Sequence, residues 1–208
     1  MKNLRPSLPA LSAMLLMAFA EPSYADLIKG MTLTQGGWHN ANGQAVINSF
    51  GCTSSTGTSS AGMTLGQWLY CNFWNLFPHC ASKTNAQVAA DFQTAHSLVG
   101  LQGNTYAKAF SVPLGCCAST IGLCFNSTAA QCGFIATVGG LGEETYNVGN
   151  NGAAFGVPNG TTLTVFDVMQ TANANYNPVT GLFYGGDATR TNELNNVLDG
   201  IDQKGDIL

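Results

Sequence analysis

The chain has few charged residues. Only 9% of its 208 residues are Asp, Glu, Lys or Arg, and the formal net charge is −4. An acidic balance with 7 Lys and Arg in total argues against a nucleic-acid partner and against an anionic membrane surface. The polar surface must come mainly from Asn, Thr, Ser, Gln and Gly, and such a surface resists self-association only weakly.

The sequence also lacks the short motifs of common catalytic and metal sites. It contains no G-x-S-x-G elbow, no H-x-x-x-H or H-E-x-x-H pattern and no C-x-x-C pair. Glu143 and Glu144 are adjacent, so in an extended segment they point to opposite faces and do not form a glycosidase pair. Asp199, Asp202 and Asp206 do not have EF-hand spacing. We therefore expect a non-enzymatic protein, with an enzyme acting on polysaccharide as a third alternative.

The N-terminal segment is typical of a secretory signal peptide. Lys2 and Arg5 precede an apolar run over residues 8–20, which is too short to span a membrane. Small residues then favour cleavage, giving a signal peptide at 1–25 and a single secreted domain at 26–208. We expect the protein to be secreted, at the cell surface or in the periplasm, with no transmembrane segment in the mature chain.

The most aromatic stretch, residues 64–80, is predicted to form the central helix. Thr64 starts a capping box, and Pro78 ends the helix. The helix is apolar on all sides, which favours complete burial in the core. The alternative is that Tyr70 and Trp74 form a surface platform for a carbohydrate or a partner protein.

Seven cysteines lie in the middle of the chain: Cys52, Cys71, Cys80, Cys116, Cys117, Cys124 and Cys132. In an exported protein they predict a disulfide framework over residues 52–132, with one thiol left over because the number is odd. Cys71 and Cys80 are expected to tie the central helix to its surroundings. The neighbours Cys116 and Cys117 are expected to have different partners, but the sequence does not determine the pairing.

Capping signals and hydrophobic periodicity predict the remaining elements. Residues 31–42 are predicted to contain a strand, and 101–142 give no clear pattern apart from a strand at 134–138. The expected helices and the expected hairpin are as follows: helices at 43–50, 84–99, 164–176 and 187–203, and a hairpin of 145–148 with 153–157. The predicted fold is mainly α with minor β, a single disulfide-stabilised domain that ends in a helical hairpin at 164–204.

Three histidines are the candidate metal ligands. They are His39, which follows a tryptophan, His79, which precedes Cys80, and His96. Imidazole with a nearby thiol suits copper in an oxidising compartment. The preferred interpretation has no cofactor, and copper is the alternative.

Three motifs near the two ends of the chain resemble a known group. They are Thr34–Trp38 (TQGGW), Gly160–Leu163 (GTTL) and Leu194–Ile201 (LNNVLDGI). Their combination resembles secreted bacterial surface domains that begin with Thr-Gln-Gly-(Tyr or Gly)-Trp and close with a Leu-Asn-x-x-Leu-x-x-Ile-Asn helix. The resemblance leaves the cysteine-rich middle unaccounted for. It implies an extracellular location and a non-catalytic role, and it supplies no catalytic residues.

Location, composition and missing motifs together predict a non-enzymatic extracellular or cell-surface protein with a structural or binding role. Its expected partner is a cell-surface protein, another copy of itself or a carbohydrate. The alternative is a copper-binding or redox protein that uses His, Trp and Cys side chains.

Overall fold

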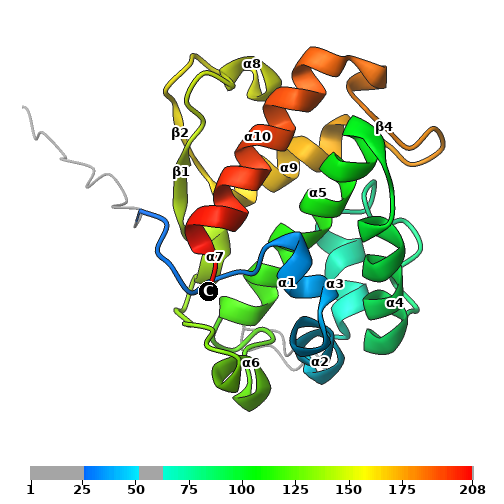
Figure 1. Ribbon diagram of the computed structural model, residues 1–208, viewed down its shortest axis with the longest axis vertical. Coiled ribbons are helices and arrows are strands. Elements are labelled where there is room, and N and C mark those ends of the chain that lie inside the picture. The colour runs from blue at the N-terminus through cyan, green and yellow to red at the C-terminus, as the bar shows by residue number, and fades with distance from the viewer. Residues whose placement is uncertain (1–25, 52–62, 208) are drawn as a thin grey trace, which may run out of the picture.

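Helix α5 (Gly100–Ser119) forms the centre of the molecule, and the other elements are arranged around it (Figure 1). The computed structural model describes residues 26–51 and 63–207. Every side chain from Ala109 to Ser119 is buried, so this half of the helix has no solvent-facing side. Its neighbours are α4 (Asn85–His96), α7 (Gly140–Glu143) and α10 (Ala188–Gly205).

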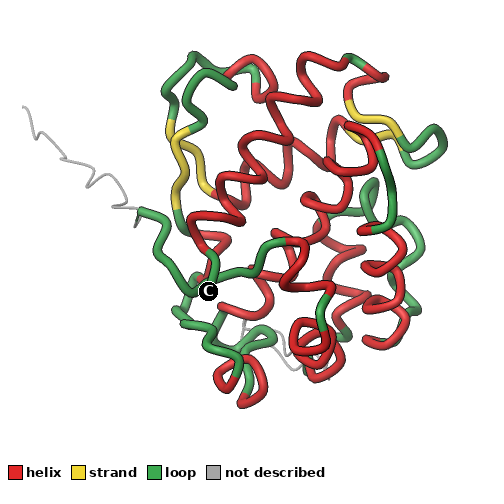
Figure 2. Tube along the Cα trace, viewed as in Figure 1, coloured by secondary structure: helices red, strands yellow, loops and turns green. Residues whose placement is uncertain are grey.

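Helices dominate the rest of the described chain, and strands are short (Figure 2). The other helices are α1 (Gln35–His39), α2 (Ala41–Ser49), α3 (Leu65–Asn72), α6 (Ser127–Gln131), α8 (Gly152–Phe155), α9 (Val165–Asn175) and the 3-10 helix η1 (Tyr184–Gly186). Two antiparallel pairs of strands complete the fold: β1 (Thr145–Asn147) with β2 (Thr162–Thr164), and β3 (Tyr176–Asn177) with β4 (Leu182–Phe183). The prediction of a mainly α fold with minor β is confirmed. No helix in the described part of the chain is long and apolar enough to cross a membrane.

Helix α5 lies where the sequence gives no clear pattern. Its glycines and Pro113 disfavour a helix locally, but burial on all sides overrides these weak preferences. At Gly115, an added Cβ would lie 2.6 Å from Thr32 Oγ1 and 2.8 Å from Leu141 Cδ2, so a side chain would push two neighbouring segments away. The strand predicted at 134–138 is wrong, since only an isolated bridge between Thr120 and Thr137 forms there.

Two other local predictions are also wrong. The region 31–42 contains helix α1 rather than a strand, and it buries Trp38 completely against Phe134, with ring centroids 5.5 Å apart. Strand β1 forms as predicted, but it pairs with β2 instead of with 153–157. Helix α8 occupies most of that segment.

The C-terminal helix α10 begins where its cap predicts. The Asp187 carboxylate accepts hydrogen bonds from Thr189 N at 2.9 Å and from Arg190 N at 3.2 Å. The predicted apolar stripe is buried in full: Leu194, Val197, Leu198 and Ile201. However, α10 packs chiefly along α5 and only lightly on α9, so the two last helices do not form an isolated hairpin.

The predicted disulfide framework is not present among the described cysteines. Five of them are free thiols: Cys71, Cys80, Cys116, Cys117 and Cys132. Cys71 and Cys80 therefore do not tie α3 to its surroundings, and the neighbours Cys116 and Cys117 do not go to different partners. Cys124 is disulfide-bonded, and Cys52 lies outside the described residues. Packing thus replaces most of the expected bridges, because α5 brings its cysteines into the core as small apolar side chains.

The N-terminal described segment is joined to the C-terminal end of α10. The Gly205 carbonyl oxygen accepts from the backbone N–H groups of Gly30, Met31 and Thr32 at 3.0, 2.9 and 3.0 Å. Lys204 Nζ also lies 3.2 Å from Asp26 Oδ1. The predicted boundary of the signal peptide lies outside the described residues, so this junction involves only the segment predicted to be mature.

One carboxyl group is buried between α5 and α10. Asp202 is 2% exposed, and burial raises its pKa well above the usual value. Asp202 Oδ2 is hydrogen-bonded to Ser111 Oγ, and Ser111 Oγ also lies 2.9 Å from the Lys108 carbonyl oxygen. A serine hydroxyl has a single hydrogen. Both bonds are satisfied if protonated Asp202 donates to Ser111, which in turn donates to the carbonyl.

We expect Asp202→Asn to remove a pH dependence of stability. Because the folded-state pKa is raised, the contribution of Asp202 is fully present below the unfolded pKa and is lost as pH rises through the folded one. The variant should lack this fall, which amounts to about 1.4 kcal/mol per pH unit between the two pKa values. Urea titrations at several pH values measure the slope. Asp26→Asn, a change at an exposed surface position, is the control, and an unchanged slope in Asp202→Asn would contradict the assignment.

Candidate functional site

Helix α3 is shorter than predicted, and the segment that follows it builds the candidate site. The capping box of Thr64 and Gln67 is confirmed, with both side-chain bonds formed. The helix ends at Asn72, however, and Phe73 leaves the helical conformation with φ −139° and ψ 55°. Residues 73–80 form a loop rather than the last turns of a helix.

The loop is held by a single buried amide from α9. Asn173 Oδ1 accepts from Asn75 N at 2.9 Å and from Leu76 N at 3.1 Å. In return, Asn75 Nδ2 donates to the Asn173 carbonyl oxygen at 2.9 Å. The two bonds from backbone N–H groups replace helical bonds that Asn75 and Leu76 would otherwise make. They explain why α3 ends before Pro78.

The loop turns Trp74 outward into an open groove. Trp74 is 58% exposed, so the prediction of a fully buried central helix is wrong at this residue. The groove has a volume of about 530 Å³, and we call it the Trp74 groove. Its lining is aromatic and amide-rich without a charged side chain: Trp74, Asn75, Ala174, Asn175, Tyr176, Asn177, Pro178, Tyr184 and Gly185. Tyr70 is 40% exposed but does not line the groove, so the structure separates the two aromatic candidates.

Another part of the groove lining has an unusual backbone conformation. Tyr184 has φ 50° and is the one residue other than glycine with positive φ in the described chain. Gly185 and Gly186 follow in the same region, with φ 62° and 95°. A side chain in this region costs about 1–2 kcal/mol. The Tyr184 hydroxyl donates to the Ala154 carbonyl oxygen at 2.7 Å, which fixes the ring at the groove wall.

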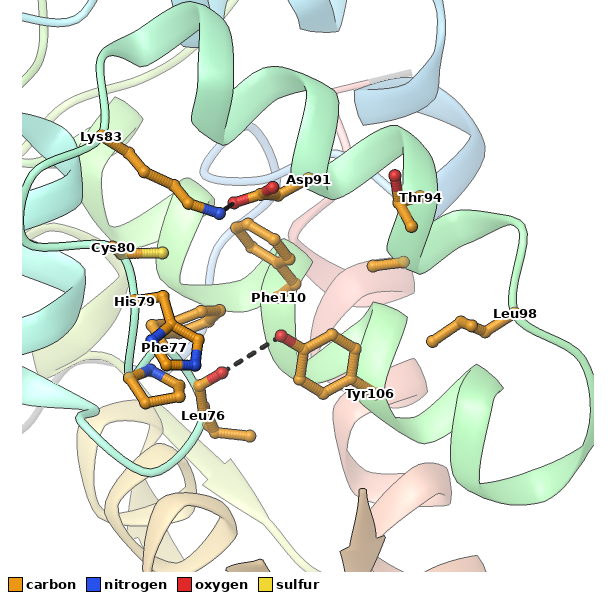
Figure 3. Close-up of a pocket in the computed structure, with 12 residues that line it drawn as sticks. Leu76, Phe77, His79, Cys80, Lys83, Asp91, Thr94, Leu98, Tyr106 and Phe110 are labelled. Atoms are coloured by element: carbon orange, nitrogen blue, oxygen red, sulfur yellow. Dashed lines mark hydrogen bonds and ion pairs between the residues drawn. The ribbon is translucent and has the colours of Figure 1, made fainter. Parts of the chain in front are cut away.

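The other side of the same loop lines a smaller cavity, which we call the Cys80 cavity (Figure 3). It has a volume of about 220 Å³ and is lined by Leu76, Phe77, Pro78, His79, Cys80, Lys83, Asp91, Thr94, Ala95, Leu98, Tyr106 and Phe110. Lys83 and Asp91 on its wall form an ion pair with each other. The Tyr106 hydroxyl donates to the Leu76 carbonyl oxygen at 3.1 Å, and burial raises the pKa of this phenol.

Cys80 and His79 are adjacent in this cavity but do not form a nucleophile and base. Burial, followed by the negative charge of Asp91, raises the pKa of the Cys80 thiol to about 11. The thiolate is the reactive form, so Cys80 is a weak nucleophile near neutral pH. His79 is exposed, and no hydrogen bond joins it to Cys80 in the described structure. The cavity is therefore poorly suited to covalent catalysis.

A pair of stacked tyrosines separates the groove from the cavity. The rings of Tyr106, in the cavity, and Tyr176, in the groove, have centroids 5.2 Å apart and an interplanar angle of 27°. Tyr176 also contacts Phe183, at 4.8 Å between centroids. The aromatic wall connects the groove to the core, so its shape is set by packing rather than by a mobile surface side chain.

The structure brings together two of the three candidate metal ligands. The rings of His39 and His96 stack with centroids 4.2 Å apart and an interplanar angle of 26°, while His79 lies at the Cys80 cavity. Stacked rings direct their nitrogen lone pairs along separate planes, so the pair as it stands is not a chelate. Burial, followed by the proximity of His39, lowers the pKa of His96. Among residues 26–51 and 63–207, no three His, Cys, Asp or Glu side chains are grouped to bind a metal.

Sequence reasoning identified Trp74 but missed the residues that position it. Asn173 lies within the apolar stripe of α9, and an amide there is the signal for a specific partner across the interface. Tyr184 precedes Gly185-Gly186, a dipeptide typical of a tight turn with positive φ. Neither feature of the sequence shows which distant segment Asn173 or Tyr184 contacts.

We expect Asn173→Leu to destabilise the protein and to release the Trp74 loop. Two backbone N–H groups lose their acceptor, which costs about 2 kcal/mol or more. Asn173→Asp keeps an acceptor of the same shape and is the matched control. Chemical denaturation measures the loss of stability. Tryptophan fluorescence detects the change in the surroundings of Trp74 when the loop is released. Equal stability of Asn173→Leu and the native chain would contradict the role given to this amide.

We expect thiol labelling to separate the free cysteines by burial. In the native protein, the exposed Cys71 should react with iodoacetamide, whereas Cys80, Cys116 and Cys117 should react only after denaturation. Burial raises the pKa of the Cys116 thiol to about 12, which reduces its reactivity further. Peptide mass spectrometry measures each position. Recovery of a disulfide-linked peptide containing Cys71 and Cys80 would contradict the structure.

The groove and the cavity have to be interpreted from their own chemistry. No protein-family model, no curated protein and no solved structure matches this chain. The resemblance of Thr34–Trp38 and Leu194–Ile201 to secreted surface domains therefore stays a prediction.

Proposed function

We propose that the protein is a non-enzymatic extracellular binding protein that holds an uncharged saccharide in the Trp74 groove. The observation that carries this proposal is the 58% exposed Trp74 in a groove whose lining has no charged side chain. Exposed tryptophan is unfavourable in water unless its apolar face gains a partner. The C–H face of a pyranose ring is such a partner.

The polar groups in the groove also suit a saccharide. Asn75 and Asn175 each use their amide nitrogen internally, to the carbonyl oxygens of Asn173 and Thr171, and this leaves their amide oxygens as acceptors. Asn177 uses its amide oxygen to accept from Val179 N and Thr180 N, and this leaves its amide nitrogen as a donor. Acceptors and donors fixed by internal bonds match the paired donor and acceptor character of sugar hydroxyls.

The same lining argues against hydrolysis of the bound sugar. Glycoside hydrolysis uses two carboxyl groups on either side of the scissile bond. No Asp or Glu lines the Trp74 groove. Binding without cleavage is the function that this chemistry supports.

The other roles stay predictions beside this one. Secretion and a place at the cell surface depend on residues 1–25, which lie outside the described structure. Self-association or binding to a surface protein remains compatible with the weakly charged surface. Copper binding is not favoured by the stacked His39 and His96 rings, and metal analysis of the purified protein tests it.

We expect Trp74→Ala to weaken saccharide binding roughly tenfold or more, because a central aromatic side chain commonly carries much of the binding energy. Affinity electrophoresis against soluble neutral polysaccharides, followed by calorimetry with their oligosaccharides, measures the loss. Tyr70→Ala is the matched control, since Tyr70 lies on α3 and is exposed outside the groove.

The comparison of these two variants decides the proposal. Loss of saccharide binding in Trp74→Ala, with binding retained in Tyr70→Ala, supports the Trp74 groove as the binding site. Failure of the native protein to bind any neutral polysaccharide, or an equal loss in both variants, would overturn it.

A further inference from the structure

A second hollow lies on another side of α3 and contains a different kind of lining. It has a volume of about 340 Å³, and we call it the Glu143 cleft. Its lining comes from α3, α5, α7, β2, α9 and the segment 120–139: Trp68, Cys116, Thr120, Leu123, Val138, Gly139, Gly142, Glu143, Thr164 and Phe166. None of these residues lines the Trp74 groove, so the two sites are independent.

Glu143 is the one acidic or basic side chain among the residues that line the cleft. No Lys, Arg or His side chain lies within ion-pair distance of it among the described residues, whereas Lys83, Lys108, Arg190 and Lys204 each pair with another carboxylate. The structure makes room for this carboxylate at Gly139, because an added Cβ there would collide with Glu143 Oε2. Gly139 has φ −87°, so the glycine is required by space and not by backbone conformation.

A second carboxyl group is adjacent to Glu143 in the chain. The buried carboxyl of Glu144 follows it, and burial raises the pKa of Glu144, with further contributions from Asp26 and Glu143. Both hydroxyls on the wall are engaged internally: Thr120 donates to the Cys116 carbonyl oxygen at 2.6 Å, and Thr164 accepts from Asp167 N at 3.0 Å. The cleft therefore offers negative charge but few free hydrogen-bonding groups.

Aromatic and aliphatic side chains form the rest of the wall. Trp68 and Phe166 each contact the buried ring of Phe73, with centroid distances of 5.7 and 5.6 Å. Leu123 and the exposed Val138 add apolar surface. An aromatic wall beside a carboxylate attracts organic cations through the ring quadrupole and through charge. An inorganic cation would need several oxygen ligands, which this wall does not offer.

We infer that the Glu143 cleft binds a small organic ammonium ion with an apolar substituent. The ammonium group lies against the Glu143 carboxylate, and the apolar substituent packs on the exposed parts of Trp68 and Phe166 that line the cleft. The inference does not depend on the saccharide site, and either one can fail without the other.

The test uses two probes of the same shape that differ in charge. Phenyltrimethylammonium carries the cation, and tert-butylbenzene is its neutral counterpart. Calorimetry on the full secreted protein should show binding of the cation and weaker binding of the neutral compound. Equal affinity for the two probes, or no binding of the cation, overturns the proposal.

Two variants then locate the binding. Glu143→Gln should weaken binding of the cation about fivefold, which is the effect of losing one partly exposed charge partner. It should leave binding of tert-butylbenzene unchanged. Gly142→Leu should abolish binding of both, because its Cβ would lie 3.8 Å from Cys116 Sγ and 4.0 Å from Phe166 Cδ2 and the longer side chain would fill the cleft. Asp199→Asn removes one charge elsewhere and is the control.

Each variant result bears on the proposal. If Gly142→Leu does not fold by circular dichroism, Glu143→Gln decides the outcome alone. A Glu143→Gln variant with unchanged affinity for the cation would falsify the site. Co-sedimentation with phosphatidylcholine vesicles, competed by phenyltrimethylammonium, would identify a lipid headgroup as the source of the ammonium group. Absence of co-sedimentation with retained binding of the free cation would identify a soluble amine.

Discussion

The amide of Asn173 is the interaction on which the candidate site depends. It reaches from α9 to the loop after α3, and it satisfies two backbone N–H groups that a helix would have satisfied for itself. By doing so it ends α3 early and turns Trp74 to solvent while Leu76 remains in the core. One loop thus lines two hollows, the Trp74 groove and the Cys80 cavity; Figure 3 shows the second of them. A buried polar group is costly unless it is fully paired, and here the pairing determines the shape of a surface.

The parts of the fold that are predictable from sequence are those with local signals. The capping box at Thr64 forms as expected, and the apolar stripe of α10 is buried. Helix α5 is not predictable in this way, because its glycines and its proline argue against a helix and only the surrounding elements make one favourable. The cysteines are misleading for the same reason: Cys80, Cys116 and Cys117 occupy core positions as free thiols, and sequence spacing does not distinguish a packed thiol from a bridged one.

The candidate site is predictable only in part. An exposed role for Trp74 follows from amphipathic aromatics in an unusually aromatic stretch, but a helical model places Tyr70 and Trp74 on one face. The loop separates them, since α3 ends between the two residues. The groove wall at Tyr176 and Tyr184 comes from segments roughly a hundred residues further along, and the Glu143 cleft combines residues of α3, α5, α7 and α9 that are far apart in the sequence. Such combinations arise from tertiary packing, for which one sequence carries no direct signal.

The junction between Gly205 and the segment 30–32 also affects how the protein is presented to its surroundings. It brings the two described ends of the chain together beside α7 and β1, whereas β4 and its neighbouring turn lie at the opposite side of the molecule (Figure 1). An anchor or a fusion partner attached through either end would therefore leave the Trp74 groove unobstructed. For a molecule displayed on a surface or immobilised on a sensor, tethering by either terminus should orient this groove outward.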